Sequence, residues 1–187
     1  MNLSNQLTLS RLFLTVLFVG ALTLSTSWSL PAACFLFSLA AFTDWLDGFI
    51  ARRYQLCTNV GRLLDPLADK VLVSAAFICL IPFHALPAWA VVIIIAREFL
   101  ITGLRLLASE KGVVIASDRF GKHKTGWQFV TILFYLLLLS AKQLAPHDQR
   151  WILWSWDYLG PILIGITLLL TVASGASCLW KNRVFLK

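Results

Sequence analysis

Six apolar segments, each long enough to cross a lipid bilayer, recur along the chain and limit what it can fold into. A helix needs about 20 mostly apolar residues to span the hydrocarbon core of a membrane. The segments cover roughly residues 7–28, 31–53, 60–82, 86–108, 122–142 and 156–179. Only 13% of the 187 residues are charged, which is too few to cover the surface of a soluble protein. The sequence therefore predicts an all-α integral membrane protein with six transmembrane helices, and the short connections predict one domain over residues 1–187.

Basic residues are distributed unevenly between the two ends of these predicted helices. If the N-terminus lies in the cytoplasm, 14 of the 16 Lys and Arg residues lie on or near the cytoplasmic side. Only Lys142 and Arg150 then face outward. Because cytoplasmic loops are enriched in Lys and Arg, this distribution predicts that both termini are cytoplasmic. The net charge of +7 is thus explained by membrane orientation, and we expect no nucleic-acid partner.

Four of the nine acidic residues lie close together, where the second predicted helix ends and the third begins. Asp44 and Asp47 are three residues apart, and Asp65 and Asp69 are four apart. Residues at these spacings share one face of a helix. Because the connection between the two helices is short, we expect antiparallel neighbours with all four carboxylates at one depth. The candidate active site therefore lies near the cytoplasmic face of the membrane.

Two explanations account for four carboxylates in this apolar setting, where each charge costs a few kcal/mol. One is a network of interfacial salt bridges with the nearby basic residues Arg52, Arg53, Arg62 and Lys70. The other is a pair of divalent cations, since carboxylates without His or Cys favour hard ions such as Mg²⁺ or Mn²⁺. Two such ions about 3.5–4 Å apart are suited to phosphoryl transfer. Gly48 and Gly61 fit this second explanation, because a missing side chain lets a polyphosphate approach the backbone.

A second group of charged residues lies near the cytoplasmic ends of the fourth and fifth predicted helices. Arg97 and Arg105 are eight residues apart, about two helical turns, and so lie on roughly one face. Lys122 and Lys124 lie where the fifth helix begins. These cations suit an anionic acceptor such as a phosphorylated polyol, although they could instead extend to the membrane surface or bind anionic lipid headgroups. We expect Glu98 to be a structural partner of an arginine.

The acidic region also carries a complete motif. It reads D-x-x-D-G-x-x-A-R-x(8)-G-x-x-x-D-x-x-x-D and comprises Asp44, Asp47, Gly48, Ala51, Arg52, Gly61, Asp65 and Asp69. In this motif, and in its six predicted spans, the chain resembles the CDP-alcohol phosphotransferases. Enzymes of that family displace CMP from a CDP-linked lipid with an alcohol and use two divalent ions.

The resemblance assigns roles to individual residues. Asp44, Asp47 and Asp65 match the metal ligands of the family, and Asp69 matches a residue that both holds a metal and takes the proton of the attacking hydroxyl. The positions expected to contact CDP-diacylglycerol are Asn5, Thr8, Gly48, Arg52, Thr58 and Gly61. The resemblance also implies a homodimer in contact with membrane lipids.

The acceptor is predicted from further positions. The A-R-E run that ends at Glu98, the downstream Arg105, the G-K-x-K-T run that ends at Thr125 and the opening N-x-x-T-x-x-R resemble one branch of the family, in which the acceptor is sn-glycerol 3-phosphate. The resemblance covers about residues 3 to 130, whereas the last third is only generically membrane-like. The residues expected to bind glycerol 3-phosphate are Arg97, Arg105, Lys122 and Lys124.

The sequence leaves other functions open. Within the family, the acceptor could instead be phosphatidylglycerol, inositol phosphate or serine. Outside the family, a divalent-cation transporter would also carry intramembrane acids. The compact size and short cytoplasmic loops predict a multi-pass protein of a bacterial cytoplasmic (inner) membrane.

Overall fold

The computed structural model describes residues 3–24, 26–54, 59–110, 119–144 and 150–182, and every regular element in these ranges is helical. The main helices are α1 (Leu3–Thr23), α2 (Ser29–Tyr54), α3 (Asn59–Leu80), α4 (Ala88–Glu110), α5 (Arg119–Leu144), α6 (Arg150–Trp154) and α7 (Gly160–Lys181). A short 3₁₀ turn, η1 (Ile81–Phe83), follows α3, and a π-helical turn, η2 (Ser155–Leu159), joins α6 to α7. Each of the six predicted apolar segments coincides with α1, α2, α3, α4, α5 or the continuous run from α6 to α7, so their helical character is confirmed.

The first helix ends earlier than the apolar pattern predicts. The pattern extends to residue 28, but α1 stops at Thr23 and α2 begins at Ser29. Pro31 lies in the first turn of α2, where the missing N–H is tolerated. From α5, the amide nitrogen of Gln143 donates to the Thr26 carbonyl (2.8 Å), and its oxygen accepts from the Leu30 N–H (3.0 Å). A polar side chain distant in sequence therefore binds the backbone where the chain reverses.

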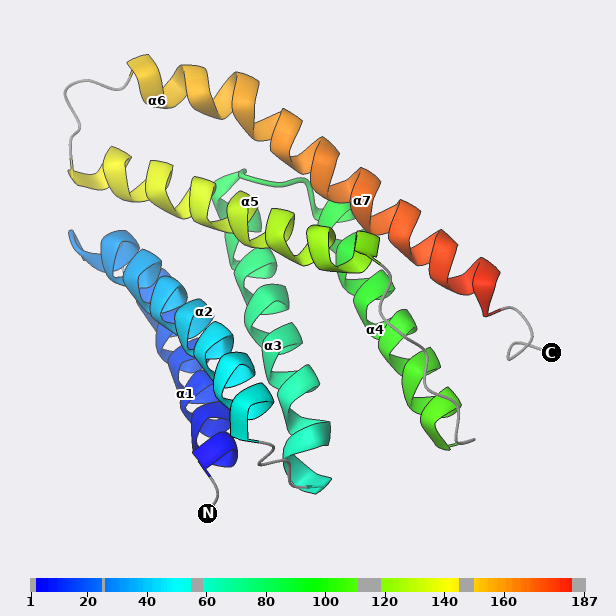
Figure 1. Ribbon diagram of the computed structural model, residues 1–187. Helices are drawn as coiled ribbons and strands as arrows, with labels where there is room; N and C mark the ends of the chain where they lie inside the picture. Colours follow the sequence, from blue (N-terminus) through cyan, green and yellow to red (C-terminus); the bar gives the residue numbers. More distant parts are fainter. Residues whose placement is uncertain (1–2, 25, 55–58, 111–118, 145–149, 183–187) are drawn as a thin grey trace.

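The helices pack as neighbours that are not always consecutive in sequence. Helix α1 packs against α2 and α3, α2 also packs against α5, and α7 packs against both α4 and α5 (Figure 1). The buried rings of Phe18 and Phe37 and the partly buried ring of Phe129 come from three different helices, and the ring centroids are 5.7 Å apart in each successive pair. The contact between α4 and α7 brings the last helix against a helix that lies far from it in the sequence.

The apolar character of the described helices is typical of a membrane protein. Residues His123–Leu144 and Arg150–Lys181 are long and apolar enough to cross a bilayer, and shorter apolar helices cover Leu9–Thr23, Ser29–Thr43 and Lys70–Phe83. Large hydrophobic side chains such as Val16 and Leu169 are more than half exposed. A water-soluble protein rarely exposes so many apolar side chains, whereas lipid tails accept them.

A close approach between α5 and α7 fixes how these two helices meet. Tyr135 of α5 is buried and packs edge-to-face against Trp156 of the π-helical turn, with ring centroids 4.9 Å apart. A Cβ added at Gly160 would collide with the Tyr135 hydroxyl. Further along, the hydroxyls of Thr131 and Thr167 share a buried hydrogen bond of 2.8 Å. These contacts set the position of α7 beside α5.

Candidate active site

The four aspartates of the motif lie on two successive helices. Asp44 and Asp47 are in α2, and Asp65 and Asp69 are in α3. The two helices run in opposite directions, and the end of α2 lies near the start of α3 (Figure 1). Backbone hydrogen bonding is helical through all four positions, so each pair has the spacing of one helix face. The aspartate side chains lie outside the described part of the structure.

The chemistry of this donor set fits hard divalent cations. Four carboxylates on two neighbouring helices supply only oxygen, the donor that Mg²⁺ and Mn²⁺ prefer. Among the residues whose side chains are described, no group of three or more His, Cys, Asp or Glu could hold a metal ion. The motif carboxylates, whose side chains lie outside the described part, thus stay the predicted metal ligands.

The other positions expected to bind CDP-diacylglycerol are placed only by their helices. Asn5 and Thr8 lie in α1, Gly48 and Arg52 in α2, and Gly61 in α3, and the structure describes none of these side chains. Thr58 lies outside the described residues. Their predicted contacts remain predictions.

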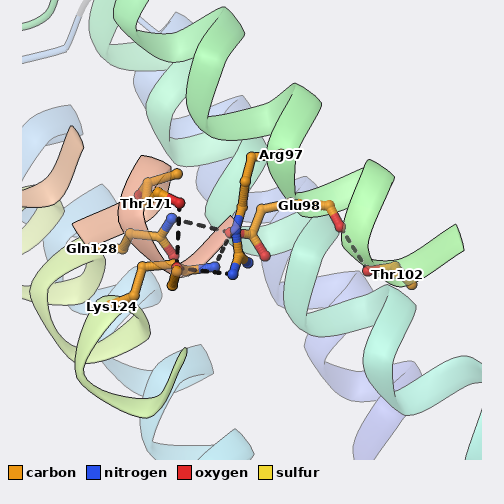
Figure 2. Close-up of polar contacts among 7 residues, drawn as sticks. Arg97, Glu98, Thr102, Lys124, Gln128 and Thr171 are labelled. Atoms are coloured by element: carbon orange, nitrogen blue, oxygen red, sulfur yellow. Dashed lines mark hydrogen bonds and ion pairs between the residues drawn. The ribbon is translucent and has the colours of Figure 1, made fainter. Parts of the chain in front are cut away.

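A buried polar cluster lies where α4, α5 and α7 meet. It consists of Arg97 and Glu98 from α4, Lys124 and Gln128 from α5, and Ser174 from α7, and Figure 2 shows its α4 and α5 members pointing toward one another. The Glu98 carboxylate oxygen Oε1 accepts from the Lys124 ammonium and from Gln128 Nε2 (3.4 Å), and it forms an ion pair with Arg97 Nη1 (3.5 Å). The Glu98 carboxylate thus connects α4 to α5, and Arg97 extends the cluster to α7 by donating from Nη2 to Ser174 Oγ (2.9 Å).

The arrangement around Glu98 confirms the expectation that it is a structural partner of an arginine. Its backbone carbonyl also accepts a hydrogen bond of 2.7 Å from Thr102 Oγ1, one turn further along α4 (Figure 2). Because both its side chain and its backbone are bound, Glu98 is held in place from two directions. It pairs with a lysine as well as with the expected arginine.

The polar cluster carries more positive than negative charge. The side chains of Lys124, Glu98 and Arg97 are only 3%, 12% and 15% exposed, so solvent screens them weakly. Two cations share one carboxylate, and Arg105, two turns along α4, is close enough to act on Arg97 electrostatically. An excess of buried positive charge favours an anionic ligand.

Two arginines in this region have a buried side-chain nitrogen atom. The Nε atoms of Arg97 and Arg105 have no hydrogen-bond partner among the residues that the structure describes. A buried donor without a partner is costly, and native proteins rarely leave one without a reason. Both donors belong to residues predicted from the sequence to bind a phosphate.

The polar cluster lies close to the helix that carries half of the acidic motif. Lys70 directly follows Asp69, the last residue of this motif, in α3. Helix α3 also packs against both α4 and α5. Of the four predicted acceptor residues, the structure joins Arg97 and Lys124 through Glu98 and places Arg105 nearby, while the side chain of Lys122 is outside the described part.

Sequence reasoning missed the contributions of Gln128 and of α7. Gln128 lies one turn after Lys124 and so shares its helix face, which is a signal that could have been used. Ser174 and Gly175 belong to the run S-G-A-S in the last helix, where small residues permit close helix approach. Nothing local to that run shows that it faces α4.

Comparison with known proteins identifies the class. The model of the CDP-alcohol phosphatidyltransferase family matches residues 1–173, and the chain belongs to this family. It is therefore a membrane transferase of phospholipid biosynthesis, which sets aside the cation transporter considered above.

Individual relatives agree with one another in name. The chain is 38% identical to a CDP-diacylglycerol–glycerol-3-phosphate 3-phosphatidyltransferase of Bacillus subtilis, over all of this chain and 97% of the relative. A relative of the same name in Rickettsia felis is 33% identical, over 94% of this chain and 92% of the relative. Another, in Mycoplasma pneumoniae, is 31% identical, over 82% of this chain and 76% of the relative.

Proposed function

We propose that this protein transfers the phosphatidyl group of CDP-diacylglycerol to the 1-hydroxyl of sn-glycerol 3-phosphate. The acceptor oxygen forms a new bond to the lipid-linked phosphorus, the bond to CMP breaks, and the products are phosphatidylglycerol phosphate and CMP. The names of relatives that match nearly the whole chain support this assignment. The observation that carries it is the pair of buried Nε donors on Arg97 and Arg105, which have no hydrogen-bond partner within the described ranges, beside a cluster with excess positive charge.

The donor side of the reaction rests on the acidic motif. Asp44, Asp47, Asp65 and Asp69 would hold two divalent ions, Mg²⁺ or Mn²⁺. When bound, such ions neutralise charge on a pyrophosphate and favour in-line displacement. Gly48, Gly61 and Arg52, with Asn5, Thr8 and Thr58, bind the CDP-lipid in this proposal.

The acceptor side rests on the basic residues of α4 and α5. Asp69 accepts the proton of the glycerol hydroxyl, since a carboxylate close to the reacting oxygen can act as general base. Arg97, Arg105, Lys122 and Lys124 bind the acceptor's own phosphate, because guanidinium and ammonium groups form charge-assisted hydrogen bonds with phosphate oxygens. Helix α3, which carries Asp69, packs against both α4 and α5, and this supports a short distance between the two halves of the site.

The membrane topology and location of the protein are part of the proposal. We place the chain as a single domain over residues 1–187, with six transmembrane helices in a bacterial cytoplasmic membrane and both termini in the cytoplasm. The active site then lies near the cytoplasmic face, where glycerol 3-phosphate is dissolved. The many exposed apolar side chains would contact membrane lipids and a second copy of the chain in a homodimer.

An acceptor panel tests the proposal. Purified protein receives CDP-diacylglycerol, Mg²⁺ and one acceptor at a time, and CMP release is measured. We expect release with glycerol 3-phosphate, and not with phosphatidylglycerol, inositol phosphate or serine. Asp69→Asn, which keeps the shape but loses the base, should reduce turnover at least about 100-fold. Release with another acceptor alone would refute the acceptor assignment, and full turnover by folded Asp69→Asn would refute the base.

A further inference from the structure

The last helix contributes to the acceptor side of the site, although the family match stops at residue 173, just before the residues concerned. Ser174 of α7 is 2% exposed, and its hydroxyl accepts a hydrogen bond of 2.9 Å from Arg97 Nη2. The same hydroxyl donates to the Thr171 carbonyl at 3.2 Å, so its direction is fixed by its own helix. Ser174 therefore offers Arg97 an oriented acceptor.

The neighbouring glycine makes room for the same arginine. A Cβ added at Gly175 would lie 3.0 Å from Arg97 Cγ and 3.4 Å from Arg97 Nε. The first distance is tighter than ordinary side-chain contacts, and the crowded atom belongs to the stem that carries the guanidinium. An alanine at this position would require the Arg97 side chain to shift by a few tenths of an ångström, which would move the guanidinium that it carries.

Together these contacts define the position of the Arg97 guanidinium from two sides. Glu98 attracts Nη1 from α4, and Ser174 accepts from Nη2 across the interface with α7. Nε, the remaining nitrogen, is buried and has no partner among the described residues. A guanidinium held in this way keeps its Nε donor available for an anion.

We infer that Ser174 and Gly175 are positioning residues for the acceptor's phosphate and act through Arg97. This inference rests on the proposed function, because it assigns Arg97 to a phosphate-bearing acceptor. A phosphorylated acceptor needs the guanidinium in one orientation, since the donors of an arginine form a rigid fork. CDP-diacylglycerol bound at the acidic motif would be unaffected by the loss of either residue.

Steady-state kinetics of the purified full chain tests the inference. Ser174→Ala should raise KM for glycerol 3-phosphate about tenfold, which is the lower end of what a charge-assisted hydrogen bond contributes. The kcat and the KM for CDP-diacylglycerol should stay within about twofold. Ser174→Thr retains the hydroxyl and should restore KM for glycerol 3-phosphate. Gly175→Ala should raise the same KM at least as much as Ser174→Ala.

Two matched controls separate positioning from a general effect on the fold. Ser140→Ala removes another buried serine hydroxyl, which is bound to the Leu136 carbonyl in α5. Gly165→Ala adds a methyl to α7 where nothing lies within 4 Å. Both should leave all kinetic constants near those of the wild type. Equal rises in both KM values, an unchanged KM in Ser174→Ala, or no rescue by Ser174→Thr would overturn the inference.

A binding measurement keeps this test separate from that of the proposed function. Thermal unfolding is followed with and without inorganic phosphate, for the wild type and Ser174→Ala. If glycerol 3-phosphate proves not to be the acceptor, the proposed function fails, but phosphate should still raise the Tm of the wild type more than that of Ser174→Ala. Equal shifts in the two proteins, or none in the wild type, would refute the role of Ser174.

Discussion

Glu98 should contribute strongly to stability, because its one carboxylate pairs with the buried Lys124 and the partly buried Arg97. The change to test is Glu98→Gln, which keeps the size of the side chain and removes its charge. At the 3.5 Å separation from Arg97 Nη1, Coulomb's law with an effective dielectric constant of about 20 gives an attraction of roughly 5 kcal/mol. The desolvation of both groups offsets part of this attraction. Breaking a buried pair by removing one partner typically costs about 3–5 kcal/mol, because the other charge stays buried.

Thermal unfolding in detergent, followed by tryptophan fluorescence, measures this effect. For a chain of this size, each kcal/mol shifts the Tm by about 2–4 °C, so Glu98→Gln should lower the Tm by roughly 6–20 °C. Asp157→Asn is the matched control, since Asp157 is exposed, and it should change the free energy of unfolding by less than about 0.5 kcal/mol.

A double variant tests whether the unpaired charge of Lys124 causes the loss of stability in Glu98→Gln. In Glu98→Gln with Lys124→Met, the buried lysine charge is removed together with its partner, so the loss should be smaller than the sum of the two single losses by about 0.5–3 kcal/mol. A Tm for Glu98→Gln within about 2 °C of the wild type would refute the reasoning. Additive losses would show that Lys124 does not depend on Glu98.

Three further results are expected. Thr131→Val should lower the free energy of unfolding by about 1 kcal/mol, because it leaves the buried Thr167 hydroxyl with a poorer hydrogen-bond partner. Changing both threonines to valine should recover part of this loss when thermal unfolding is measured. Gln143→Ala should cost about 1–2 kcal/mol and speed amide hydrogen exchange at Leu30, since it removes contacts to the backbone at Thr26 and Leu30. Removing divalent ions with EDTA should abolish CMP release, and Mg²⁺ or Mn²⁺ should restore it; release that persists in EDTA would contradict a metal role for Asp69 and its neighbours.

Much of the helical framework could be predicted because its signal is local. A run of apolar residues of membrane-spanning length indicates a helix wherever it occurs, and α2, α3 and α4 begin and end within about two residues of the predicted segments. The predicted first segment starts and ends later than α1 does, because the apolar pattern continues past the point where Ser and Thr interrupt the helix. The turn at Thr26–Ser29 depends on Gln143, which lies more than 100 residues away in the chain.

The acidic motif was also readable from the sequence, since its meaning depends on spacing within two consecutive helices. Asp44 and Asp47 need only one helix to share a face, and so do Asp65 and Asp69. A short connection then makes the two helices neighbours. Family membership follows from the same residues and is shown by the match over residues 1–173.

Tertiary structure alone decided which residues surround the basic group. The sequence indicates that Arg97 and Lys124 are cationic and lie near helix ends, but it does not say that they share Glu98. The sequence also does not indicate that Ser174 and Gly175 lie against the side chain of Arg97, because these residues follow Arg97 by 77 and 78 positions. Helix formation and helix faces depend on residues three or four apart, whereas contacts between α4 and α7 depend on how all the helices pack. The sequence by itself therefore determined the class of protein and its acidic motif, and the packing of the last helix determined how the candidate phosphate site is held.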